Sequence, residues 1–110
     1  MDLNSEARDG YAVIALGGRL TATGAPLLRN AVGDLITAGE SRIVIDMVDL
    51  QFVDSSGLGA LVGGLKSARV AGGDLRIAAV PDAVRTVLRL TNLDRVLRDY
   101  PTPESAFDGR

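Results

Sequence analysis

The sequence predicts an α/β fold in which a four- to five-stranded mixed β-sheet packs against about four α-helices. Apolar, β-branched runs alternate along the chain with segments whose apolar residues recur every three or four positions. Such alternation is typical of a sheet whose strands are connected through helices. The 110 residues have an apolar content of 46%, which is ordinary for a globular protein, so we expect one domain over residues 1–110.

The first half of the chain is expected to contribute a hairpin, a helix and a central strand. The apolar run at 11–18 is typical of a buried strand, and an Asp9-Gly10 turn would pair it with a short edge strand before it. Thr23 is expected to cap the helix that follows. The continuous apolar run at 42–47 predicts a strand buried on both faces, followed by a seven-residue connection.

The second half is expected to contribute further helices and strands, separated by Gly and Pro. Its longest element is a helix that follows an Asp-Ser-Ser triplet. In chain order, the expected elements are a helix at 55–71, a strand at 74–80, a helix at 82–92, a strand at 95–98 and a short terminal helix at 103–107.

Two missing residue types exclude several classes of function. The chain has no cysteine and no histidine, which excludes disulfides, thiolate nucleophiles, Cys-ligated zinc and a Ser-His-Asp triad. We therefore expect no enzyme activity, no cofactor and no metal.

Charge and hydropathy argue against two further kinds of partner. The net charge of −2 gives no support to nucleic-acid binding. No apolar run approaches the roughly 20 residues that span a bilayer, and the acidic N-terminal residues are unlike a signal peptide. We therefore expect no nucleic acid and no membrane, and a cytoplasmic location.

The segment VDSSGLGALVGGLKS at 53–67 places four glycines in an expected helix, although glycine costs about 1 kcal/mol relative to alanine there. A face of small residues either packs closely against another element or forms a flat docking surface, and glycine in place of alanine favours docking. The predicted core stripe comprises Leu58, Leu61, Val62, Leu65 and Ala68, and the predicted small-residue face comprises Ser56, Ala60, Gly63 and Ser67, with Gly64 alongside.

Asp54, Ser55 and Ser56 stand at the expected start of this helix. Either Asp54 or Ser55 is suited to cap it, which leaves Ser56 on the small-residue face. An accessible hydroxyl there is suited to phosphorylation. A phosphate adds about −1.5 to −2 charges, and a partner on that face would have to desolvate them. Phosphorylation of Ser56 is thus predicted to release a bound partner.

The segment IVIDMVDLQFVDSSGLGALVGGLKSARVAGGDLRIAAV and the later PDAVRTVLRLTNLDRVL resemble the STAS domain, specifically the bacterial anti-sigma factor antagonists. DSSGLG after a strand and a short loop is that family's signature, and the resemblance covers about residues 8–107. It implies a stress-response regulator whose unphosphorylated form binds an anti-sigma factor, a GHKL-type serine kinase, and frees the sigma factor. It also implies phosphorylation of Ser56 by that kinase and a PP2C-type phosphatase that resets it.

Two departures from the family pattern are visible. The family usually has an acidic residue after the second strand, in a G-x-L-D pattern, where GRLT places Thr21; this departure affects expected kinase recognition. Asn92 stands for a usual glycine, and asparagine readily adopts a left-handed backbone. The residues expected to contact the partner are Thr21, Asp54, Ser55, Ser56, Gly57, Ala60, Gly63, Gly64 and Ser67.

Other functions are less well matched by the sequence. A receiver domain would phosphorylate Asp46, but the first strands offer no acidic pair for Mg²⁺, so Asp46 and Asp49 are interpreted as strand-end and turn residues. A serine hydrolase would need G-x-S-x-G and a histidine. The alternative that stays open is a STAS module of a lipid-transport complex or a stressosome-like sensor. A monomer or weak homodimer is expected.

Overall fold

The structure is a computed structural model that describes residues 1–108, so the last two residues of the expected domain lie outside the described part. Within it, five strands, three α-helices and one 3₁₀ helix form, which confirms the predicted α/β class with a mixed sheet. The elements are β1 (Asp2–Arg8), β2 (Tyr11–Leu20), α1 (Ala25–Thr37), β3 (Arg42–Val53), α2 (Ser55–Val70), β4 (Asp74–Ala78), α3 (Asp82–Leu90), η1 (Leu93–Arg95) and β5 (Asp99–Tyr100).

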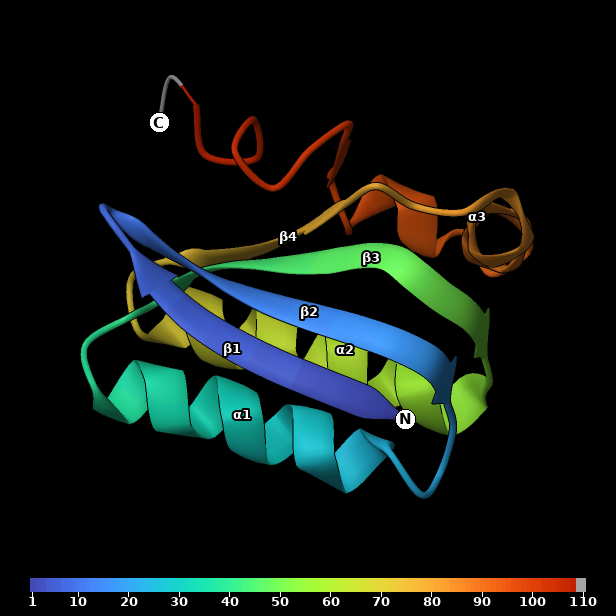
Figure 1. Ribbon diagram of the computed structural model, residues 1–110, viewed down its shortest axis with the longest axis horizontal. Coiled ribbons are helices and arrows are strands. Elements are labelled where there is room, and N and C mark those ends of the chain that lie inside the picture. Colours follow the sequence, from blue (N-terminus) through green and yellow to red (C-terminus); the bar gives the residue numbers. More distant parts are fainter. Residues whose placement is uncertain (109–110) are drawn as a thin grey trace.

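The sheet has the strand order β1-β2-β3-β4-β5. The predicted hairpin is confirmed: β1 and β2 are antiparallel, with Arg8 opposite Tyr11 across the Asp9-Gly10 turn. Gly10 has a φ of 88°, which suits glycine. The other neighbouring strands are parallel. In Figure 1, α1 and α2 lie along one side of the sheet and the C-terminal segment lies on the other.

The predicted connection after residue 47 is wrong, because β3 continues to Val53. Irregularities in the β2–β3 register interrupt the pairing, which then continues from Gly17↔Asp49 to Leu20↔Val53. The physical reason is burial: Leu50 and Val53 are each 2% exposed in the main core, so strand pairing continues past the polar residues between them. Asp49 is therefore a strand residue rather than a turn residue, and Asp46 lies inside β3 rather than at its end.

Three local predictions are also wrong. Thr23 does not cap α1, because the N-cap is Gly24 and no side chain caps the helix. A proline in the first turn has no backbone N–H, so one fewer donor there needs a capping partner. The strand expected at 95–98 is replaced by η1 and the later β5, which pairs Ile77 with Asp99. Residues 103–107 form turns instead of a helix.

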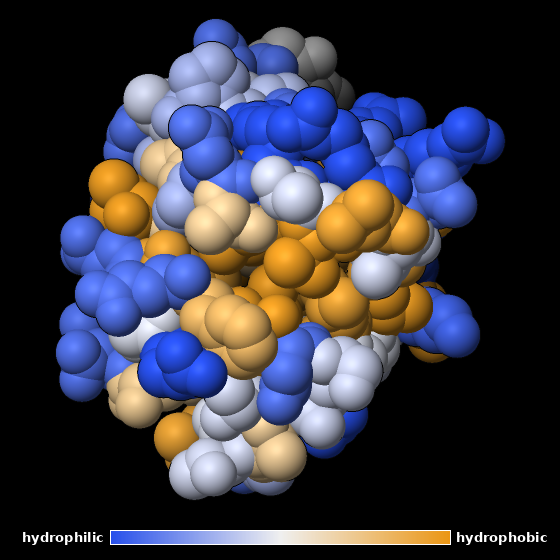
Figure 2. Space-filling view, turned by 90° about the vertical axis from the view of Figure 1, so that its right-hand side faces the viewer, coloured by the Kyte–Doolittle hydropathy of each residue, from blue (hydrophilic) through white to orange (hydrophobic). Residues whose placement is uncertain are grey.

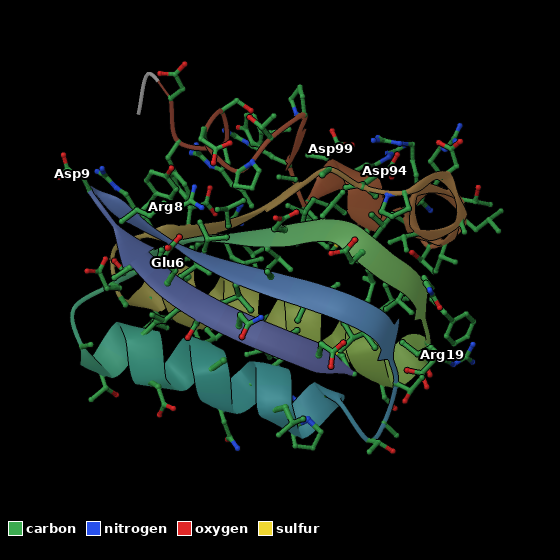
Figure 3. All side chains as sticks on the ribbon, in the orientation of Figure 1. Glu6, Arg8, Asp9, Arg19, Asp94 and Asp99 are labelled. Atoms are coloured by element: carbon green, nitrogen blue, oxygen red, sulfur yellow. The ribbon has the colours of Figure 1, made fainter. Side chains whose placement is uncertain are left out.

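The C-terminal segment is held to the sheet by one aromatic residue and by ion pairing. Phe107 is 1% exposed and stacks on Tyr11, with 6.1 Å between ring centroids. Arg8 Nη1 donates to Glu104 Oε2 at 2.5 Å, and this hydrogen bond lowers the pKa of Glu104 below its usual value. Figure 3 shows Arg8 beside Glu6 at the hairpin end of the sheet, close to this segment.

Helix α2 packs on the sheet and alongside α1, so more of its circumference is buried than the predicted stripe allows. Leu58, Leu61, Leu65 and Ala68 are buried as predicted, whereas Val62 is only half-buried. A Cβ placed on Gly64 would lie 3.0 Å from Leu75 Cδ1. The residues of α2 that are buried are Gly57, Leu58, Ala60, Leu61, Gly64, Leu65 and Ala68.

Two glycines of α2 should respond oppositely to alanine. A Cβ on Gly57 would lie 2.5 Å from the carbonyl oxygen of Leu20, which is backbone, so Gly57→Ala should cost about 1–3 kcal/mol of unfolding free energy. A Cβ on Gly63 meets no heavy atom within 4 Å, so Gly63→Ala should add about 0.5–1 kcal/mol. Urea unfolding of both variants measures the difference, and equal effects would contradict this packing.

Candidate functional site

The candidate site lies where the carboxyl ends of β2 and β3 meet the amino end of α2. Leu20 and Val53 are opposite each other, so Thr21 and Asp54 follow directly at the same edge of the sheet. The Asp54 N–H donates to the Leu20 carbonyl at 3.1 Å. The Thr21 carbonyl accepts hydrogen bonds from the start of α1. The structure thus brings Thr21 and Asp54 together, although they are far apart in sequence.

Asp54 is the N-cap of α2. Its Oδ1 accepts a hydrogen bond of 2.9 Å from the Gly57 N–H, and its backbone is extended, as expected for a capping residue. Of the two candidate caps, the structure therefore selects Asp54. Ser55 becomes the first helical residue, and neither Ser55 nor Ser56 is needed to start the helix.

The two serine side chains differ in exposure. Ser55 is exposed, and Ser56 is half-buried beside it in the first turn. Within residues 1–108, neither the Ser55 hydroxyl nor the Ser56 hydroxyl makes a hydrogen bond to another group of the chain. The choice of Ser56 over Ser55 as the phosphorylated residue stays a prediction.

Two of the residues predicted for the small-residue face do not point outward. Ala60 and Gly64 are buried, so their placement on an exposed face is wrong, and Gly57, an expected partner contact, is buried as well. Gly57 is enclosed by the end of β2, and Gly64 by α1 and β4, where Val32 Cγ2 would be 3.4 Å from an added Cβ. Small residues here let the backbone of α2 approach its neighbours within the core.

The exposed side of α2 is the side that faces away from α1 and the sheet. Ser67 is exposed on it and Gly63 is half-buried there, and their role as partner contacts stays a prediction. Gly59 also lies there, with Arg29 Nη2 being the atom nearest to an added Cβ at 3.8 Å. Lys66 is exposed on the same side and was not among the predicted residues. This side therefore carries small residues near Ser56 and a positive charge farther along the helix.

Sequence reasoning also missed a cation and an aromatic ring at the end of the sheet. The Arg19 guanidinium carbon lies 4.3 Å from the ring centroid of Phe52, its register partner. Phe52 is 38% exposed, and Figure 3 places Arg19 at the end of the molecule where α2 begins. No sequence signal pairs these two residues, because a register shift between Gly18 and Arg19 precedes their pairing.

Apolar side chains gather on the same end of the molecule. Figure 2 shows an apolar area on the side that carries the end of β3, the beginning of α2 and helix α3. Exposed large apolar residues on these elements include Val48 and Phe52 on β3 and Leu90 on α3. A surface of this kind, beside small residues, is typical of a protein-binding site.

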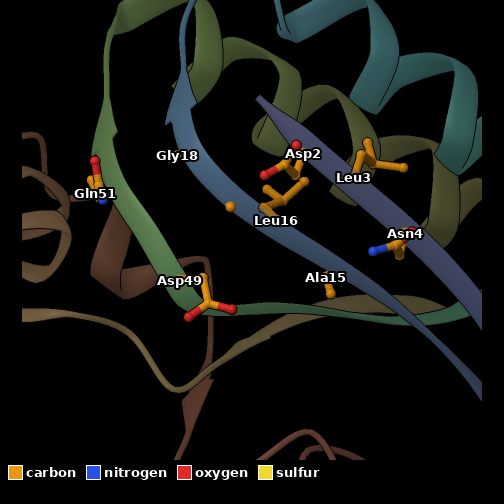
Figure 4. A pocket seen from close by; sticks show the side chains of 9 residues that line it. Asp2, Leu3, Asn4, Ala15, Leu16, Gly18, Asp49 and Gln51 are labelled. Carbon is orange, nitrogen blue, oxygen red and sulfur yellow. The ribbon is translucent and has the colours of Figure 1, made fainter.

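A hollow lies on the face of the sheet that does not carry α1 and α2. It encloses about 610 Å³, and its lining includes Asp2, Gly17 and Asp49. Figure 4 shows the side chains of Asp2 and Asp49 in this lining, on neighbouring parts of the sheet. Among residues 1–108, no three His, Cys, Asp or Glu side chains come together as a possible metal site. None of the helices in the described part of the chain is long and apolar enough to cross a bilayer.

The family comparison agrees with the position of the Asp-Ser-Ser triplet at the start of α2. The STAS domain family profile matches residues 2–106. This chain belongs to the STAS domain family. The resemblance inferred from DSSGLG is thereby confirmed. In this STAS domain, Asn92 has a φ of 59° and thus takes the left-handed conformation expected where the family has glycine.

Similar STAS proteins carry names from one functional group. A Thermotoga maritima protein, provisionally named an anti-sigma factor antagonist, is 31% identical over 101 residues, covering 91% of this chain and 89% of its own. The anti-sigma F factor antagonist of Paenibacillus polymyxa is 26% identical, covering 97% and 92%.

A solved structure of the antagonist SpoIIAA in its unphosphorylated form superposes with a TM-score of 0.82 at 25% identity, covering 97% of this chain and 94% of that one. The phosphorylated form of the Bacillus protein superposes with a TM-score of 0.74 at 25% identity, covering 97% of each chain.

Proposed function

We propose that this STAS domain is an anti-sigma factor antagonist controlled by phosphorylation of Ser56. In its unphosphorylated state it binds an anti-sigma factor and so frees the sigma factor. The observation that carries the proposal is that Asp54 alone caps α2. Its Oδ1 accepts the 2.9 Å hydrogen bond from the Gly57 N–H, so the Ser56 hydroxyl is not needed to cap the helix. The names of the relatives support the same role.

The partner is proposed to be a GHKL-type serine kinase, and a PP2C-type phosphatase is proposed to remove the phosphate. The exposed side of α2 suits such a partner, because Gly63, about two turns along the helix from Ser56, lets another backbone approach closely. The apolar area toward α3 would add buried surface to the contact (Figure 2). A cytoplasmic location follows from such a partner. The STAS domain itself acts by binding and not by catalysis.

Phosphorylation is proposed to act on binding and not on folding. A phosphate at the amino end of α2 gains about 0.5–1 kcal/mol from the helix dipole. Repulsion by Asp54 at roughly 6 Å and an effective dielectric of about 40 costs about 2–3 kcal/mol, which the folded chain tolerates. A docked partner would also have to desolvate the dianion. The phosphate therefore opposes docking far more than it opposes folding.

Phosphorylation of Ser56 should lower affinity for the anti-sigma kinase at least a hundredfold, about 2.7 kcal/mol, because a dianion would be buried at the contact. Circular dichroism should be unchanged, and the melting temperature should fall by roughly 5–10 °C, because a net repulsion of about 1–2 kcal/mol remains. Calorimetric titration of both forms measures the affinity. Ser56→Ala should bind constitutively and accept no phosphate.

The matched control for this site is Ser55→Ala, which removes the neighbouring exposed hydroxyl and should leave phosphorylation intact. Mass spectrometry after incubation with kinase and ATP identifies the modified residue. Phosphate on Ser55 alone, or on neither serine, would contradict the assignment. If co-purification recovered transporter subunits or a sensor assembly in place of a kinase, the alternative STAS function would replace this one.

Gly63→Arg should weaken partner binding at least tenfold, about 1.4 kcal/mol, because the new side chain would occupy the exposed side of α2. The melting temperature should hold or rise, since nothing lies within 4 Å of an added Cβ. Thr37→Arg places the same side chain on the exposed end of α1 and should leave affinity unchanged. A loss of stability without a loss of affinity would refute docking at Gly63.

Thr21→Asp should change the rate of Ser56 phosphorylation more than the affinity for the kinase. It restores the carboxylate usual in the family next to Asp54, where the ends of β2 and β3 meet. A time course of phosphate incorporation, compared with titration of the unphosphorylated form, separates the two quantities. Equal changes in both, or none, would show that Thr21 has no regulatory effect.

A further inference from the structure

Strand β1 leaves one backbone edge of the sheet open. Within residues 1–108 it pairs only with β2, in an unbroken register from Asp2↔Gly17 to Arg8↔Tyr11. Leu3 and Arg8 are half-buried, and the rest of the strand is exposed. Figure 1 shows β1 as the outermost strand on its side. An open edge of seven residues is a template for a further strand.

The hairpin register shows which backbone groups face this edge. Arg8 and Tyr11 flank the two-residue turn and so exchange both of their backbone hydrogen bonds. Hydrogen-bonded and non-hydrogen-bonded pairs alternate along an antiparallel ladder. The backbone N–H and C=O groups of every second residue of β1 are therefore directed toward β2. The N–H and C=O groups of the residues between, Leu3, Ser5 and Ala7, are therefore directed to the open edge.

We propose that this edge binds a second copy of the chain, with two β1 strands pairing antiparallel about a two-fold axis at Ser5. In that register Ser5 lies opposite Ser5, and Leu3 lies opposite Ala7 of the other copy. These are the residues whose backbone groups face outward, so all three form hydrogen-bonded pairs. The helices of both copies then lie on the same side of one continuous sheet, because opposed residues share a face.

Charge selects this register over its neighbours. It places Asp2 opposite Arg8 of the other copy, twice, and Asn4 opposite Glu6. A shift of two residues in one direction opposes Asp2 to Glu6, and in the other direction it opposes Glu6 to itself. Both shifted registers bring like charges together, so the side chains of β1 are complementary to themselves in only one of the three registers.

Arg8 can take part without losing its present contacts. In the described part of the chain its Nε donates to Glu6 at 2.7 Å, and its Nη1 is shared between Glu104 and Tyr11. Among residues 1–108, none of these hydrogen bonds uses Nη2 of Arg8 as the donor. A guanidinium has five N–H donors, so one further carboxylate, that of Asp2 from the second copy, can be accommodated.

An apolar groove beside the edge supplies surface to bury. It encloses about 500 Å³ between β1 and α1, and its apolar lining includes Met1, Leu3, Leu27 and Leu35. Leu27 is 51% exposed, which is unusual for a large apolar side chain on an amphipathic helix. In the proposed dimer the two grooves lie on the same side of the sheet, next to the axis, so each is covered by the other copy. This interface does not depend on the function proposed for Ser56.

The first experiment exchanges charges between copies. Sedimentation equilibrium of the full chain, from micromolar to millimolar concentration, should show a reversible dimer. Asp2→Arg alone and Arg8→Asp alone should each weaken it at least tenfold, because each variant opposes like charges. An equimolar mixture of the two variants should dimerise again, since both pairs are then opposite in charge. Circular dichroism checks that each variant is folded.

The second experiment uses the absence of native cysteine. The Cα atoms of Ser5 and its copy would be about 5.5 Å apart, within the range of a disulfide, so Ser5→Cys should form a covalent dimer under mild oxidation. Ala7→Cys is the matched control: it is exposed on the same strand, but its two copies lie about four residues, or roughly 13 Å, apart. This test remains decisive if Arg8→Asp fails to fold.

Three outcomes would overturn the proposal: a strictly monomeric chain at millimolar concentration, equal crosslinking of both cysteine variants, or no recovery of the dimer in a mixture of two folded charge variants. Selective crosslinking through Ser5→Cys together with recovery in the mixture would establish it. Loss of the dimer would leave kinase binding and phosphorylation at Ser56 unaffected, so the two proposals fail separately.

Discussion

The contact between Gly57 and the carbonyl oxygen of Leu20 determines how the helices meet the sheet. An added Cβ would be 2.5 Å from that oxygen, and the same oxygen accepts the Asp54 N–H at 3.1 Å. The end of β2 is therefore fixed against the first turn of α2. Because β3 pairs with β2 up to Val53, the position of Asp54 and the two serines follows from this one approach. A side chain at Gly57 would displace the whole candidate site.

Small residues serve two different purposes on α2. Gly64 faces Val32 and Leu75 within the core, where a larger side chain would separate α2 from α1 and from β4. Gly63 is the next residue along the chain, and it faces open space. Neither packing nor backbone geometry requires glycine at Gly63, so its presence there costs helix stability without a structural return. That cost is consistent with the docking role proposed for Gly63.

The site at α2 and the open edge of β1 use different parts of the sheet. The first is built on the carboxyl ends of β2 and β3, and the second on the outward backbone groups of β1. In the proposed dimer, each copy would keep its own α2 surface. A dimer would then present two docking surfaces on one continuous sheet, and association of copies would not compete with the partner for the same backbone.

The sequence by itself determined the α/β class, the hairpin at Asp9-Gly10, the start of α2 at the Asp-Ser-Ser triplet and the STAS resemblance. Each depends on local chemistry, such as a turn glycine or a capping carboxylate, which short-range spacing reveals. Only the tertiary structure decided that β3 reaches Val53, that Arg19 stacks on Phe52, and that Ala60 and Gly64 are buried while Gly63 is open. Helical periodicity gives the angle between residues on α2 but not the position of α1 beside it. The burial of a small residue depends on that neighbour, which lies far away in the sequence.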